Sequence, residues 1–144
     1  MKTSNSTHLL IDTSFKDSLI CVVRNNQVIY QLSTNQQRAD NLLSLIAQIF
    51  GQELPAHFDS IIVRLGLGSY TGLRIGTTIA CALSWSYRIP IVGVYSRRPR
   101  SLTVKELVRL ARTKKPKLSS AWPVLIPKYT AWRSKPEFDK LKKQ

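Results

Sequence analysis

The feature that most restricts the fold is a glycine-rich junction, GLGSYTGLRIG at residues 66–76, which links the apolar run SIIVRL to the apolar run TTIACALSW. A strand followed by glycines that open a helix presents free backbone N–H groups and the positive end of a helix dipole, an arrangement that suits an anion. The spacing fits neither the P-loop, because no lysine follows the sixth position, nor the dinucleotide fingerprint, because Gly72 arrives one residue late. Two interpretations stay open: a phosphate-binding turn, or a turn whose glycines let helices pack closely.

The hydrophobic pattern around this junction predicts three strands, then a helix, a strand, a helix and a strand. Asn25-Asn26 favours a two-residue hairpin turn, Gly51 a left-handed helix cap, and Pro90 the end of the second helix. This order predicts an α/β fold with a mixed five-stranded sheet flanked by helices. The expected strands cover residues 8–12, 18–24, 27–33, 59–65 and 90–95, and the expected helices cover residues 37–50 and about 71–88.

Both expected helices are apolar on more than one side. The apolar positions of the first cover an arc of roughly 200°, whereas a helix lying on one sheet needs a stripe of about 100°. The second carries only one charge, Arg74, between Leu73 and Tyr87. We therefore expect each helix to cover the sheet and also to dock onto a partner. The expected partner-binding residues are Leu42, Leu43, Ile46, Ile49, Phe50, Leu73, Gly76, Thr77, Ala80 and Ser84.

The charge is distributed unevenly along the chain. Residues 1–96 carry 7 basic and 5 acidic residues, a net charge of +2, and residues 97–144 carry 15 basic and 3 acidic residues, a net charge of +12. The sequence thus predicts a nearly neutral domain over residues 1–96 and a basic C-terminal extension over residues 97–144. Within the extension, Thr103 and Glu106 form a capping-box pattern that opens an amphipathic helix ending near Arg112.

Lysine and arginine side chains neutralise phosphates, so the basic extension suggests RNA contact. The candidate residues are Arg97, Arg98, Arg100, Lys105, Arg109, Arg112, Lys114 and Lys115. Trp122, Tyr129 and Trp132 follow them, and such aromatic side chains either stack on unpaired bases or close the edge of a domain; we favour the second interpretation here. A solvated basic helix without a nucleic-acid partner is the alternative interpretation of the charges.

Three segments together resemble one known family. Residues 62–76, IVRLGLGSYTGLRIG, are similar to the TsaB pattern of an apolar strand followed by GPGSFTGLRIG, Asp12-Thr13-Ser14 matches the family's first-strand IDTS, and residues 91–96 look like its VGVSS strand. The resemblance covers residues 8–96 and implies an actin-like, ribonuclease H-like fold in a shortened member that lacks most of the second domain. Pro127-Lys128-Tyr129 resembles the P-x-Y-L-R near the family's C-terminus.

The resemblance also implies a function. Members of the TsaB family are non-catalytic partners of TsaD, which together with TsaE installs threonylcarbamoyl on a tRNA adenosine next to the anticodon. On this basis the two apolar helices would form a bundle with TsaD, and the glycine-rich junction would be a vestigial phosphate turn. The residues of that turn are Asp12, Thr13, Ser14, Gly68, Ser69, Thr71 and Gly72.

The sequence departs from the family pattern at several positions. Leu67 stands where the family has a proline, and Arg38-Ala39-Asp40 stands where it has histidine, serine and glutamate. The basic extension is not a property of the family. A stand-alone basic RNA-binding module on a degenerate actin-like scaffold is therefore the alternative function, and residual ATP binding at Asp12 and the junction is a third.

The sequence predicts no enzyme, cofactor or metal site. His8 and His57 lie far apart, the junction is not a G-x-S-x-G elbow, and Cys21 and Cys81 are expected to be buried, reduced thiols. No segment reaches about 18 apolar residues, so we expect a cytoplasmic protein without membrane contact. The same helices also permit a homodimer.

Overall fold

The computed structural model describes residues 5–15, 17–34, 39–51, 58–98 and 102–116, together with Leu125 and Pro127; the side chains of Ala39, Asp40 and Phe50 lie outside this description. Its elements are β1 (Thr7–Asp12), β2 (Ser18–Arg24), β3 (Gln27–Thr34), α1 (Ala39–Gly51), β4 (Ser60–Gly66), α2 (Tyr70–Tyr87), β5 (Ile91–Tyr95) and α3 (Val104–Arg112). The predicted order of strands and helices is confirmed.

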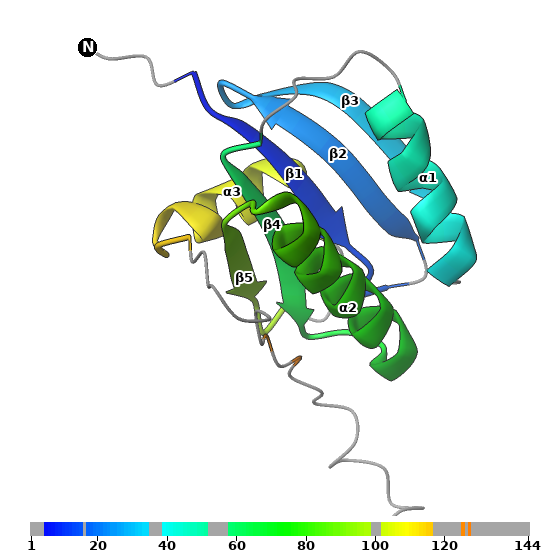
Figure 1. The fold of residues 1–144 in the computed structure, drawn as a ribbon. Coiled ribbons are helices and arrows are strands. Elements are labelled where there is room, and N and C mark those ends of the chain that lie inside the picture. The colour runs from blue at the N-terminus through cyan, green and yellow to red at the C-terminus, as the bar shows by residue number, and fades with distance from the viewer. Residues whose placement is uncertain are drawn as a thin grey trace, which may run out of the picture.

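The five strands form one mixed sheet in the order β3-β2-β1-β4-β5 (Figure 1). β1, β2 and β3 make an antiparallel meander, whereas β4 pairs parallel to β1 and β5 pairs parallel to β4. Since β1 and β4 are parallel neighbours, the segments that follow them leave the sheet at the same edge. The glycine-rich junction is thereby placed beside Asp12-Thr13-Ser14.

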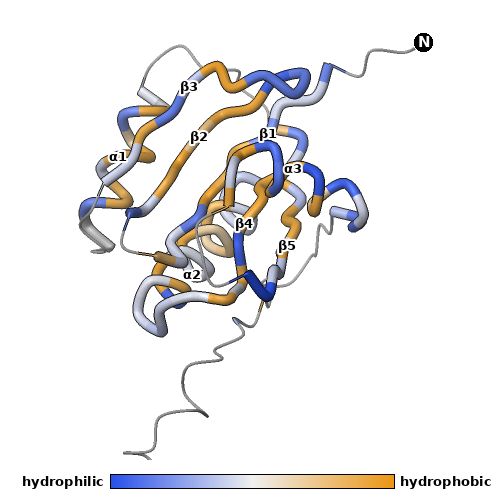
Figure 2. The backbone as a smooth tube through the Cα atoms, turned by 180° about the vertical axis from the view of Figure 1, so that it is seen from behind, coloured by the Kyte–Doolittle hydropathy of each residue, from blue (hydrophilic) through white to orange (hydrophobic). Residues whose placement is uncertain are grey.

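Helices cover both faces of the sheet, and alternation along the strands decides which side chain meets which helix. Ile61 and Val63 of β4 belong to the core under α1 and α2, while Ile62 belongs to the core under α3. Figure 1 shows α1 and α2 on one side of the sheet and α3 on the other. The central strands are apolar along most of their length, as the orange tube in Figure 2 shows, because both of their faces are covered.

The turns follow the expected chemistry with one exception. Asn25 and Asn26 have φ values of 51° and 66°, so the hairpin prediction is confirmed. Arg88 ends α2 in the left-handed conformation, with φ 58° and ψ 45°. The prediction that Gly51 caps the first helix in the left-handed region was wrong, because Gly51 is the last residue of α1 and is absent from the positive-φ residues.

The hydrophobic core extends beyond residue 96. Leu102, and Leu107, Val108 and Ala111 of α3, are buried against the second face of the sheet. The capping box is present, since Thr103 Oγ1 accepts from the Glu106 N–H at 3.2 Å and Glu106 Oε2 accepts from the Thr103 N–H at 2.7 Å. The proposed boundary at residue 96 therefore falls inside the packing of this domain, and α3 belongs to its core.

Candidate functional site

The glycine-rich junction packs directly against the segment that follows β1. Ser14 O accepts a hydrogen bond from the Ser69 N–H at 2.7 Å, and Thr13 Oγ1 donates to Gly72 O at 2.5 Å. The residues that the sequence grouped as a vestigial phosphate turn therefore do lie together, at one edge of the sheet. They meet one another through hydrogen bonds from one segment to the other.

Two of the glycines are required by this close approach. A Cβ on Gly68 would lie 2.5 Å from Ser14 O, and a Cβ on Gly76 would overlap the Thr13 hydroxyl. One N–H group at the N-terminus of α2 is capped locally, because Ser69 Oγ accepts from the Gly72 N–H at 3.0 Å. These contacts support the interpretation of the junction as a packing turn, and phosphate binding there stays a prediction.

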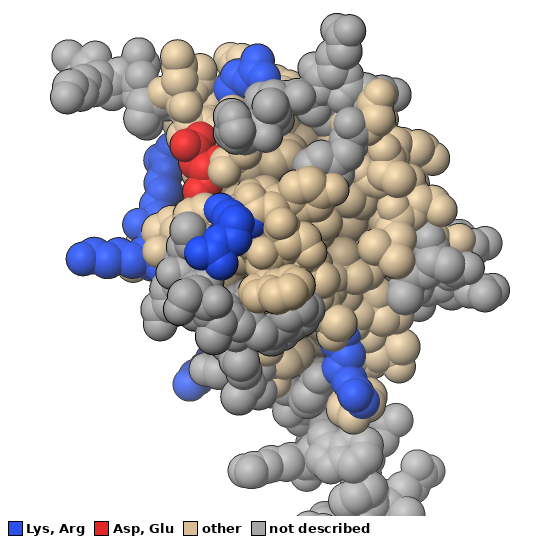
Figure 3. Space-filling view, viewed as in Figure 1, with Lys and Arg blue, Asp and Glu red and all other residues tan. Residues whose placement is uncertain are grey.

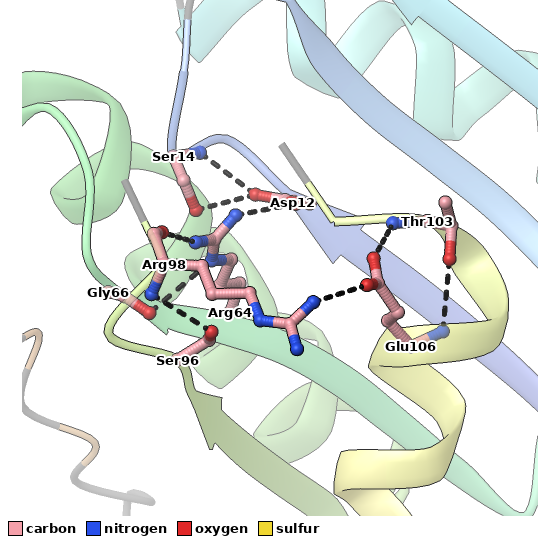
Figure 4. A network of polar contacts seen from close by, with 8 residues as sticks. All are labelled: Asp12, Ser14, Arg64, Gly66, Ser96, Arg98, Thr103 and Glu106. Atoms are coloured by element: carbon pink, nitrogen blue, oxygen red, sulfur yellow. Dashed lines mark hydrogen bonds and ion pairs between the residues drawn. The ribbon is translucent and has the colours of Figure 1, made fainter. Parts of the chain in front are cut away.

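A buried arginine occupies the other side of the same edge (Figure 4). Arg64 of β4 is 1% exposed and lies on the α3 face of the sheet, where its Nη1 is 3.7 Å from Asp12 Oδ2. Asp12 Oδ1 accepts from the Ser14 N–H at 3.0 Å and from Ser14 Oγ at 2.6 Å. Asp12 is thus held by its own turn and by a guanidinium.

Arg64 is fixed by further contacts. Its Nη2 donates to Arg98 O at 3.0 Å, its Nε donates to Gly66 O at 3.3 Å, and its guanidinium lies 5.1 Å from the centre of the Phe15 ring. Sequence analysis did not single out Arg64. The available signal was a single charge inside the apolar strand SIIVRL, which a buried strand tolerates only when the charge is paired.

Most residues expected to bind a partner are used inside the domain. Of the ten, eight are buried, and they include Ala80, which is 0% exposed beneath α2. Leu43 is 51% exposed, and the side chain of Phe50 lies outside the described residues. A charge at Ala80 would consequently disrupt the core, so Ala80 is not part of an exposed docking surface.

The residues that α1 and α2 expose on their sides away from the sheet are mostly not the ten expected partner-binding residues. Leu43 and Ala47 are exposed one turn apart on α1, and Thr78 and Trp85 are exposed two turns apart on α2. Trp85 is 48% exposed. Figure 3 shows a broad surface over these two helices that carries few charges. We call Leu43, Ala47, Thr78 and Trp85 the outer face of α1 and α2.

The basic residues gather along α3. Lys105, Arg109 and Arg112 are exposed at intervals of four and three residues, and Arg97, Lys114 and Lys115 are exposed on either side of the helix. Arg98 donates to Glu106 at 3.0 Å. Arg100, Trp122, Tyr129 and Trp132 lie outside the described residues, as does His57.

The two cysteines and His8 are shielded from solvent to different degrees, and burial shifts the pKa of each. Burial raises the pKa of Cys21 to about 12 and also raises the pKa of Cys81. His8 Nδ1 lies 2.7 Å from Ser60 Oγ, and the pKa of His8 is lowered mainly by burial. Within the described part of the chain, no three histidine, cysteine, aspartate or glutamate residues are grouped as metal ligands would be. None of the helices described there has both the length and the apolar character needed to cross a membrane.

Solved structures identify the class of fold. YeaZ from Pseudomonas aeruginosa superposes with a TM-score of 0.55 at 22% identity, covering 62% of this chain and 43% of YeaZ. T. thermophilus RuvC, in a structure of its complex with a Holliday junction substrate, superposes with a TM-score of 0.52 at 7% identity, covering 79% of this chain and 99% of RuvC. The domain therefore has the actin-like, ribonuclease H-like fold that the family resemblance implied.

Sequence comparison identifies the family. A family model described as TsaD, tRNA N6-adenosine threonylcarbamoyltransferase, matches residues 27–116. The tRNA threonylcarbamoyladenosine biosynthesis protein TsaB of Bacillus subtilis (strain 168) is 36% identical in an alignment over 94 residues that covers 62% of this chain. The chain belongs to the family that this model describes. It spans 41% of the length of that curated relative.

Proposed function

We propose that this chain is a non-catalytic TsaB-like subunit that binds a TsaD-like protein and supports threonylcarbamoyl modification of tRNA. The family model that matches residues 27–116 and the B. subtilis relative are both named for that modification. A TsaE-like ATPase would join the assembled complex, and the role in tRNA modification suggests a cytoplasmic location. The chain itself contributes the docking surface.

The observation that carries this proposal is the outer face of α1 and α2, whose four residues are uncharged; Arg74, one turn before Thr78, is the exposed charge beside them. These helices already bury one side against the sheet, yet they expose Leu43 and Trp85 on the other. Exposed apolar patches of this kind mark interaction surfaces, and tryptophan is enriched among the residues that dominate binding energy. A pair of helices from the partner would bury both residues.

The non-catalytic part of the proposal is supported by the junction and by Asp12. The Ser69 and Gly72 N–H groups donate to oxygens of the chain itself, and the Asp12 carboxylate faces Arg64. Polar groups whose partners lie within the chain itself stabilise the fold, and this supports a structural role for them. A catalytic centre would then reside in the TsaD-like partner.

The direct test is co-purification of the full chain with the TsaD-like protein of the same genome, sized by light scattering. Leu43→Glu and Trp85→Glu should each abolish the heterodimer while leaving the far-ultraviolet circular dichroism and the melting temperature close to those of the parent. Val28→Glu is the matched control, because Val28 is 44% exposed on β3, away from α1 and α2.

Two outcomes would contradict the proposed docking face. One is a heterodimer that survives both glutamate substitutions, and the other is a heterodimer lost equally in Val28→Glu. A homodimer of the chain alone that the same two substitutions dissociate would show that the face pairs with a second copy.

A further inference from the structure

A groove runs between α3 and the hairpin of β2 and β3, on the face of the sheet opposite the outer face of α1 and α2. It consists of two adjoining hollows of about 560 Å³ each, which share Asn26, Val108 and Arg112. Val23, Val28, Val104 and Val108 contribute apolar side chains to its lining. Arg112 Nη2 donates a hydrogen bond to Asn26 Oδ1 across the groove, so the hairpin and the helix are tied together.

The lining of the groove is cationic. Lys105 and Arg109 line one hollow, Lys114 lines the other, and Arg112 lines both. Among the described residues that line the two hollows there is no aspartate or glutamate. Glu106, the acidic residue of α3, accepts from Arg98 and from the Thr103 N–H. The positive charge along the groove is therefore not compensated by a lining carboxylate.

The spacing of the cations suits a chain of phosphates. Lys105 and Arg112 are seven residues apart on the helix, which corresponds to about 10 Å along its axis. A nucleic-acid strand carries one charge per about 3.4 Å of duplex axis, so this length offers about three phosphates. Asn26 and Gln27 on the hairpin supply amide groups on the opposite wall, whereas the Asn25 amide is hydrogen-bonded to Ser6 and Asn5.

We propose that this groove binds the phosphate backbone of RNA without reading its sequence. Lys105, Arg109 and Arg112 contact successive phosphates, and the hairpin amides contact phosphate or ribose oxygens. The groove is separate from the outer face of α1 and α2, so both surfaces can be occupied at once. That the bound polyanion is RNA rests on the proposed function. That the groove binds a polyanion rests only on the lysine and arginine side chains that line it.

The alternative polyanion is a membrane surface. A membrane-binding helix combines its basic side with bulky aromatic side chains on its apolar side. The apolar side of α3 instead consists of Leu107, Val108 and Ala111, which are buried against the sheet. These residues are therefore occupied and do not insert into lipid.

The test compares two triple variants of the full chain that carry the same net charge. Lys105→Gln/Arg109→Gln/Arg112→Gln removes three cations from the groove, and Arg24→Gln/Arg74→Gln/Arg88→Asn removes three exposed arginines that do not line it. Binding of bulk tRNA is measured by filter retention over a range of salt concentrations. The groove variant should bind about tenfold or more weakly than the control variant, and its salt slope should fall by about 2 to 3, because three phosphate contacts are lost.

Three results would overturn the proposal. The first is equal tRNA affinity in the two variants, the second is a salt slope unchanged by the groove substitutions, and the third is binding to phosphatidylserine vesicles without binding to tRNA. If the triple groove variant does not fold, Lys105→Gln/Arg109→Gln keeps the Arg112–Asn26 hydrogen bond and is compared with Arg74→Gln/Arg88→Asn, which has the same net charge. Retention of TsaD-like binding by the groove variant separates this proposal from the docking proposal, which Leu43→Glu tests.

Discussion

The two faces of the sheet carry helices of opposite character. α1 and α2 cover one face and expose Leu43 and Trp85, with Arg74 as the single charged residue within α2. α3 covers the other face with nine residues and exposes Lys105, Arg109 and Arg112. Apolar side chains hold both layers to the sheet, so the difference is confined to the sides that point away from it. One small domain can therefore offer one surface to a protein and another to a polyanion.

The largest expected loss of stability comes from a charge on the inner side of α2, whereas the same charge on its outer side should have little effect. Ala80→Glu would place a carboxylate in the core beneath α2, where Ala80 is 0% exposed, and the cost of burying an unpaired charge is comparable with the whole stability of a domain. We expect this variant to be unfolded by circular dichroism at 25 °C. Thr78→Glu, two residues away and exposed, should melt like the parent, and a folded Ala80→Glu protein would show that the core has been assigned wrongly.

The next largest loss of stability is expected on the α3 face of the sheet, at the buried ion pair of Arg64 and Asp12. Arg64→Met removes the cation from Asp12 and should lower the free energy of unfolding by about 3 to 5 kcal/mol, as is usual when one partner of a buried ion pair is lost. Chemical denaturation measures this loss. Arg64→Met/Asp12→Asn should recover part of it, because no buried charge is left unpaired; a double variant as unstable as Arg64→Met would indicate that the hydrogen bonds to Gly66 and Arg98 dominate.

A smaller loss of stability is expected in the glycine-rich junction, where Gly68 contacts Ser14. Gly68→Ala brings a Cβ against the Ser14 backbone and should cost about 1 to 3 kcal/mol, the range for overpacking. Gly51→Ala is the matched control, since a Cβ there meets nothing within 4 Å and alanine favours the helix. Urea midpoints that are equal for the two variants would mean that the contact between Gly68 and Ser14 is not tight.

The smallest effect is a pH dependence at the groove. Burial lowers the pKa of His8, the Asp59 carboxylate raises it, and Arg112 lowers it, with a net lowering from the ordinary value of 6.5. Below that value the unfolded chain binds more protons than the folded one, so stability should fall as the pH falls from 7.5 to 5. His8→Gln should reduce this decline in the urea midpoint, and an identical pH profile in both proteins would remove His8 as its source.

Local sequence signals predicted the elements well because their causes are local. Alternation and helical periodicity located each strand and helix to within about two residues, and Asn25-Asn26 and the Thr103-Glu106 pattern specified a turn and a cap. For the glycine-rich junction, the sequence predicted two alternatives, a phosphate-binding turn and a packing turn. It could not decide between them, because the answer depends on which segment of the chain lies beside the junction.

Residue exposure and long-range pairing were not predictable in the same way. A helix that is apolar all round does not specify which side meets its own sheet, so Ala80 was assigned to the outside although it lies inside. The pairing of Arg64 with Asp12 requires the adjacency of β1 and β4, and the contact of Arg112 with Asn26 joins residues 86 positions apart. Both follow from strand order, which no single window of sequence contains.

The position of Arg98 bears on where this chain can be shortened. Its carbonyl accepts a hydrogen bond from the buried Arg64, and its side chain pairs with Glu106 at the start of α3. A fragment ending at residue 96 would keep all five strands but leave the Arg64 guanidinium without one of its acceptors and the second sheet face uncovered. The packed unit therefore reaches at least through residue 112, and Leu125 also packs against the core, so domain grafts or split reporters should be joined beyond Leu125.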